Sequence, residues 1–242
     1  ISANRGAIVG LAFGLVGVLI YGILKGKDIS YKKLNFKATS IVILCLLFVF
    51  LSIFAVTIKS EIWQKVPGLA RIALISSEDA TTQTRLIMAK ISLQAVNPSE
   101  NSIKKLLIGW GPENFSVAYG KYFNPKQFDY EKRWFSRGHN EFFDKLVMTG
   151  LWGLIVYLSI YFFFFRSIFK RKEFSLLNIG LLFFGLSFSG YIFFVFGQIT
   201  TFIPFFAVLA FAVYLTIGDD FDKKFSTVIS SKSLMLTSTF FS

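Results

Sequence analysis

The residues best suited to chemistry in this chain are one histidine and two arginines. His139 is the only histidine among 242 residues, and histidine is the side chain that most readily accepts a proton near neutral pH. Arg5 and Arg85 carry planar guanidinium groups, which bind phosphate oxygens in pairs and keep their charge. Nearby cations favour the neutral imidazole, which is the form that a general base needs. The three residues together predict a site for a phosphorylated substrate.

Each of these residues also has a simpler interpretation. His139 can serve as a helix-capping or interfacial histidine. Arg5 lies at the mouth of an apolar run, where an arginine can extend its charged end to the membrane surface. Arg85 can be a solvated residue of an amphipathic helix. A joint role depends on whether the membrane topology brings the three to one side.

Other patterns give weaker indications of chemistry. Asp220 and Asp222 imitate a metal-binding carboxylate pair, but they lie in a mixed-charge run that is typical of a solvated helix end. The single cysteine, Cys45, leaves no thiolate zinc site. No glycine motif for a nucleotide precedes a helix in the right context. The sequence therefore predicts neither a metal nor a cofactor.

The composition indicates a membrane protein. Mean hydropathy is +0.58, and 54% of the residues are hydrophobic, with 31 phenylalanines. These residues are gathered in long runs, which is typical of a chain that has lipid as its solvent. The net charge of +12 comes largely from short loops beside those runs, so it indicates membrane orientation and no nucleic-acid partner. We predict an all-α polytopic membrane protein.

The apolar runs give five membrane spans and one large loop. The uncharged run between Phe174 and Ile217 is too long for a single span, and Gly197 and Pro204 mark a turn within it. The predicted spans are residues 8–24, 39–58, 146–165, 175–196 and 202–217.

Basic residues predict the orientation of these spans. Lysine and arginine are concentrated in the loops 25–38 and 166–173, which indicates that both are cytoplasmic. A single membrane domain, 1–217, then has an extracytoplasmic loop at 59–145 and a cytoplasmic tail at 218–242. Because the chain begins at Ile1 with no signal-peptide pattern, we interpret it as a fragment that lacks an upstream part.

The outer loop is expected to be helical and to fold over a site. Residues 81–96 form an amphipathic pattern, for which Ser77 or Asp79 is a suitable N-cap. A glycine-bounded turn at 108–115 and a helix start after His139 follow. The candidate supporting residues of the site come from these segments: Arg137, Asn140 and Glu113.

Several blocks in this order resemble the O-antigen ligase and O-antigen polymerase superfamily. The resemblance extends roughly from Ser2 to Ile168, and the later spans agree only in hydrophobicity. The blocks are Ser2–Ala7 before an apolar helix, Thr84–Leu86 opening a second helix, Leu107–Phe115, Gly138–Phe143, and Gly150–Leu154.

The resemblance implies a membrane glycosyltransferase of the bacterial cytoplasmic membrane, with its site on the extracytoplasmic face. Such enzymes take a glycan from a polyprenyl-pyrophosphate carrier, without metal or nucleotide, and move it to lipid A core, another glycan or a protein hydroxyl. By position, Arg5 and Arg85 would bind the lipid pyrophosphate and His139 would be the catalytic base.

Other functions stay open from the sequence. A surface polysaccharide polymerase or a protein O-oligosaccharyltransferase would use the same donor and the same residues. A transporter or a non-catalytic membrane protein is the alternative from another class. Transporters tend to place ionisable groups near the bilayer midplane, whereas here they lie at or outside the membrane edge. The acceptor, the glycan and the oligomeric state are not specified by any pattern in the chain.

Overall fold

A computed structural model describes residues 5–26, 30–31, 34–66, 70, 79–171 and 175–216. Five helices are long and apolar enough to cross a membrane. They are α1 (Arg5–Lys25), α2 (Phe36–Val56), α9 (Glu141–Lys170), α10 (Leu176–Phe194) and a last helix, Ile199–Thr216. The strands among the described residues, β1 (Ser30–Tyr31) and β2 (Leu34–Asn35), form one short antiparallel pair. The prediction of an all-α polytopic membrane protein is confirmed.

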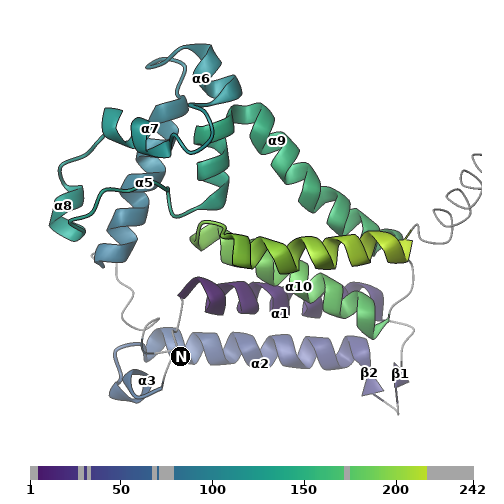
Figure 1. The fold of residues 1–242 in the computed structure, drawn as a ribbon. Helices are drawn as coiled ribbons and strands as arrows, with labels where there is room; N and C mark the ends of the chain where they lie inside the picture. The colour runs from purple at the N-terminus through teal and green to yellow at the C-terminus, as the bar shows by residue number, and fades with distance from the viewer. Residues whose placement is uncertain are drawn as a thin grey trace, which may run out of the picture.

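The short helices gather at one end of the long ones (Figure 1). Helices α1, α2, α10 and the last helix run roughly side by side, and α9 crosses them at an angle. The short helices are α3 (Glu61–Gln64), α5 (Ala80–Val96), α6 (Ile103–Ile108), α7 (Phe115–Lys121) and α8 (Gln127–Tyr130). The β1–β2 pair lies at the opposite end (Figure 1). Which end faces the cytoplasm, and the division into membrane domain and tail, stay predictions.

Helices α1 and α10 approach backbone to backbone because both carry small residues at their crossing. A Cβ added to Gly10 would lie 2.6 Å from the carbonyl oxygen of Ser187, and one added to Gly190 would lie 3.0 Å from the Cα of Gly10. Such close approach between membrane helices requires glycine or another small residue. It places the first turn of α1 beside the last turn of α10.

Helix α9 is broken at Gly150, where the backbone has φ 68° and ψ −169°. Essentially only glycine adopts this conformation. The break leaves the carbonyls of Val147 and Met148 without their helical partners. They accept hydrogen bonds from the backbone amides of Trp110, at 2.8 Å, and Gly111, at 2.9 Å. The glycine-bounded turn after α6 is thereby docked onto the break, and α9 bends sharply there (Figure 1).

The helix bounds differ from the predicted spans at several ends. Helix α2 begins at Phe36, because the Asn35 side chain accepts hydrogen bonds from the amides of Lys37 and Ala38 and caps the helix. Helix α9 begins at Glu141, before its predicted span, and the last helix begins at Ile199. The predicted tail, with Asp220 and Asp222, lies outside the described residues.

The segment 79–140 shares an apolar core with the first part of α9. Met88, Phe115, Tyr119 and Val147 are fully buried in it. Asp79 caps α5 by accepting a hydrogen bond from the amide of Thr82, at 3.2 Å, as one of the two predicted caps. This core packs α5 against the first part of α9. The side chains that project from the two helices are therefore held at a fixed distance from each other.

Candidate functional site

A cavity of about 360 Å³ opens where α1, α5, α9 and α10 meet. Its walls come from the start of α1, from α5 as far as Ala89, from residues 138–140 with Phe143 of α9, and from the last two residues of α10. These segments lie far apart in the sequence. The close α1–α10 crossing and the core of the segment 79–140 bring them to the same end of the helices.

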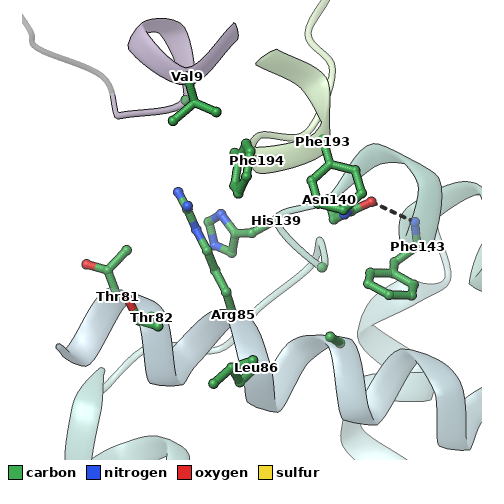
Figure 2. A pocket seen from close by; sticks show the side chains of 13 residues that line it. Val9, Thr81, Thr82, Arg85, Leu86, His139, Asn140, Phe143, Phe193 and Phe194 are labelled. Carbon is green, nitrogen blue, oxygen red and sulfur yellow. Dashed lines mark hydrogen bonds between the residues drawn. The ribbon is translucent and has the colours of Figure 1, made fainter. Parts of the chain in front are cut away.

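Two of the predicted residues, Arg85 and His139, meet in this cavity. Figure 2 shows the Arg85 side chain rising from α5 beside the His139 imidazole. The Arg85 guanidinium carbon lies 5.9 Å from the ring centroid of Phe194, a cation–π distance. Thr81 and Thr82 line the cavity one turn before Arg85. The cavity therefore combines a fixed cation, a titratable base and hydroxyl groups.

The His139 imidazole packs beside two phenylalanine rings. Its centroid is 5.2 Å from that of Phe135 and 5.5 Å from that of Phe196, both edge-on. The His139 backbone has φ 56°, a left-handed conformation that is uncommon outside glycine. Such strain persists only where the surrounding structure imposes it, and it is concentrated at functional sites.

The surroundings of His139 favour its neutral form. Burial lowers the pKa of His139 from its ordinary value of 6.5, and the positive charges of Arg85 and Arg133 lower it further, against an opposing effect of Glu131. A buried imidazole that is neutral at pH 7 can accept a proton. The sequence predicted this state from neighbouring cations, and burial is the larger cause.

Arg137 and Glu113 lie elsewhere. The Arg137 guanidinium donates to both carboxylate oxygens of Glu113, at 2.7 and 2.8 Å, and neither residue is among the described residues that line the cavity. Their ion pair ties the turn after α6 to the segment that leads into His139. Asn140 does line the cavity, but its side-chain oxygen caps α9 by accepting from the amides of Phe142 and Phe143. Each of the three thus has a contact within the fold, and their supporting role stays a prediction.

Arg5 is placed by its backbone alone. It is the first residue of α1, and its neighbour Gly6 lines the cavity. The Arg5 side chain lies outside the described part of the chain. The structure locates the start of α1 at the edge of the cavity. The contact of Arg5 with a lipid pyrophosphate stays a prediction.

Sequence reasoning missed the phenylalanines at the end of α10 and just after it, and the two acids at the start of α9. Phe194 and Phe196 come from an apolar run in which no phenylalanine stands out. Glu141 and Asp144 are 2% and 0% exposed, in the first turn of α9. Acids in the first turn of a helix are common, so nothing in the sequence indicated that these two would be buried.

The cavity suits an anion that carries an apolar group. Its described lining residues include an arginine, a histidine and two threonines but no carboxylate, and most of its wall is hydrocarbon. No group of three or more His, Cys, Asp or Glu residues that could hold a metal ion occurs in the described ranges. An amphiphilic anion could place its charge against Arg85 and its acyl or prenyl part against the membrane helices.

Comparison with known proteins identifies the family. A family model described as O-antigen ligase matches residues 1–158. No curated protein and no solved structure matches the chain. The matched region includes α1, Arg85 and His139 and extends into α9, but it ends before α10. Because the match covers well over half of the 242 residues, the chain belongs to the O-antigen ligase family, and this membership implies a multi-pass membrane glycosyltransferase of the ligase or polymerase kind that acts on lipid-linked glycans.

Proposed function

We propose that this protein moves a glycan from a polyprenyl-pyrophosphate carrier to an acceptor hydroxyl at the extracytoplasmic face of the bacterial cytoplasmic membrane. The main support is the placement of Arg85 and His139 in one cavity at the end of the membrane helices. At about 360 Å³, the cavity falls within the usual range of about 300–1,000 Å³ for small-molecule sites.

Arg85, with Arg5, binds the pyrophosphate of the donor. A guanidinium can donate two parallel hydrogen bonds to phosphate oxygens. As the bond from the anomeric carbon to the phosphate oxygen breaks, its electron pair goes to the pyrophosphate, and the fixed positive charge stabilises it there. The described lining residues include no carboxylate that could hold a bridging cation, so arginine supplies the counter-charge. We therefore propose a metal-independent reaction.

His139 acts as the general base. The acceptor oxygen forms its bond to the anomeric carbon while the neutral imidazole takes the hydroxyl proton. Direct displacement of this kind inverts the configuration at the anomeric carbon. The two phenylalanine rings beside the imidazole and its imposed backbone conformation fix the direction from which the proton is taken.

A transfer assay in proteoliposomes tests this proposal. The protein is given a polyprenyl-pyrophosphate glycan and a panel of acceptors, with EDTA present. We expect EDTA-resistant transfer that falls by at least about 100-fold in His139→Ala, since general bases contribute about 10²–10⁴ in rate. Transfer by His139→Ala at the normal rate, or transfer abolished by EDTA, contradicts it.

The acceptor panel separates the candidate activities within the family. Transfer to lipid A core indicates a ligase, transfer to a lipid-linked glycan indicates a polymerase, and transfer to a protein hydroxyl indicates a protein O-oligosaccharyltransferase. A transporter would place ionisable groups near the bilayer midplane. Arg85 belongs to α5 and His139 directly precedes α9. Helix α5 and the start of α9 lie at one end of the membrane helices (Figure 1), which favours catalysis at the membrane surface.

A further inference from the structure

Two loops meet at the His139 side chain. The first, residues 136–140, carries His139 into α9. The second, residues 195–198, joins α10 to the last helix and brings Phe196 to within 5.5 Å of the imidazole, centroid to centroid. The second loop lies beyond the region that the family model matches.

A buried carboxylate holds the first loop. Asp144 is fully buried, and its Oδ1 accepts a hydrogen bond from the backbone amide of Gly138 at 2.6 Å. Among the described residues, its Oδ2 has no hydrogen-bond partner. The Gly138 amide belongs to the Arg137–Gly138 peptide, so this bond anchors the backbone one residue before the left-handed histidine.

A second buried carboxylate holds the other loop. Glu141 is 2% exposed, and its Oε2 accepts a hydrogen bond from the backbone amide of Gly197 at 2.6 Å. Its Oε1 lies 3.2 Å from the Nζ of Lys145. Gly197 directly follows Phe196, so this bond anchors the peptide that joins Phe196 to Gly197.

We propose that Asp144 and Glu141 are positioning residues that together fix the His139 imidazole for proton transfer. They are three residues apart in the first turn of α9, and this spacing puts them on one side of the helix. Asp144 anchors the backbone just before the histidine, and Glu141 anchors the peptide that follows Phe196, whose ring packs against the imidazole. The proposal rests on the proposed function, because it takes His139 as the base.

The burial of these two acidic side chains is energetically unfavourable by itself, which indicates that it serves a function. Burying a carboxyl group costs free energy, because its oxygens lose their hydrogen bonds to water. The hydrogen bonds to the amides of Gly138 and Gly197 recover part of this cost. A requirement to hold the His139 imidazole in one orientation accounts for these two hydrogen bonds, which lie on either side of the contact between His139 and Phe196.

Nuclear magnetic resonance provides a direct test because the chain has one histidine. Protein labelled with ¹³C and ¹⁵N only at histidine gives one imidazole signal, from His139. We expect Asp144→Ala and Glu141→Ala each to shift that signal and to broaden or split it. Asp144→Asn and Glu141→Gln keep a side-chain oxygen that can accept the amide hydrogen bond, so they should keep the native signal. Glu100→Ala, which removes an exposed carboxylate of the outer segment, is the matched control.

Activity provides the second readout. Misplacing a catalytic group by about 1 Å can lower a rate by about 10²-fold, so we expect kcat to fall by roughly that factor in the two alanine variants. The Kd for a polyprenyl pyrophosphate, measured separately, should stay within about twofold, because Arg85 projects from a different helix. The Asn and Gln variants should recover most of kcat.

The outcomes separate this proposal from the proposed function. A native histidine signal in both alanine variants overturns the proposal, and so does an Asn or Gln variant as impaired as its alanine counterpart. Parallel loss of donor binding and kcat overturns it as well, because a general structural role would produce that pattern. If the signals respond as expected while His139→Ala retains full transfer, the carboxylates position the histidine but the proposed base is wrong.

Discussion

Replacing Gly150 with alanine should strongly destabilise the protein. Gly150 interrupts α9 in a conformation that is open essentially only to glycine. A Cβ at this position would overlap the backbone of Leu107 and Ile108 in the segment that crosses it. Either α9 or the turn after α6 must then move.

The structure gives the size of the effect. Holding a residue other than glycine in such a conformation costs about 1–3 kcal/mol. Separation of the turn from α9 also breaks the hydrogen bonds from Trp110 to Val147 and from Gly111 to Met148, each worth about 0.5–1.5 kcal/mol. We therefore expect Gly150→Ala to lower the free energy of unfolding by about 2–6 kcal/mol.

Unfolding by sodium dodecyl sulfate in mixed micelles, followed by tryptophan fluorescence, measures this change. Trp110 is one of four tryptophans; its indole Nε1 donates to the carbonyl of Ala95 at 2.8 Å, so its emission should change when the turn after α6 separates. Gly180→Ala is the matched control: Gly180 lies within α10, and its added Cβ would have nothing within 4 Å. Alanine is favoured over glycine inside a helix by about 1 kcal/mol, so the control should be as stable as the native protein or more so.

The reasoning fails if the two alanine variants unfold alike. A Gly150→Ala variant within about 1 kcal/mol of the native protein would mean that residue 150 adopts an ordinary helical conformation. The contact between the turn after α6 and α9 would then have a different basis from the one described.

Two predictions concern the cavity. Because the pKa of His139 is lowered below 6.5, kcat/KM should be constant near neutral pH and should fall only below pH 6.5, as the imidazole becomes protonated. Arg85→Gln removes a positive charge that lowers this pKa, so the pH–rate profile of the variant should shift to higher pH. An unshifted profile would contradict the electrostatic role of Arg85. Arg85→Lys keeps the positive charge but loses the two parallel N–H groups of the guanidinium. The Kd for the lipid-linked glycan, measured by titration in proteoliposomes, should therefore rise by about tenfold or more. An unchanged Kd would place the pyrophosphate elsewhere.

Much of the fold could be predicted because membrane helices are encoded locally. An uncharged apolar run must form a helix in lipid, since no water is available to its backbone polar groups. The turn near Gly197 followed from the excessive length of one such run. The break at Gly150 could not be predicted, because a glycine in a membrane helix is common and its role depends on contact with residues about forty positions earlier.

The site was only partly accessible to the same reasoning. Arg85 and His139 stood out by residue type, and the structure places them together. Arg137 is close to His139 in sequence but binds Glu113, and its supporting role stays a prediction. The contribution of Glu141 to the loop at Gly197 joins residues 56 positions apart, and no periodic pattern encodes such a contact.

Single-turnover transfer from a radiolabelled polyprenyl-pyrophosphate glycan tests the central claim most directly. The native protein and His139→Ala are compared after donor binding has been measured for each. We predict equal donor binding, with transfer lost by at least about 100-fold in the variant. Equal transfer by both proteins would contradict the assignment of His139 as the base and the function built on it.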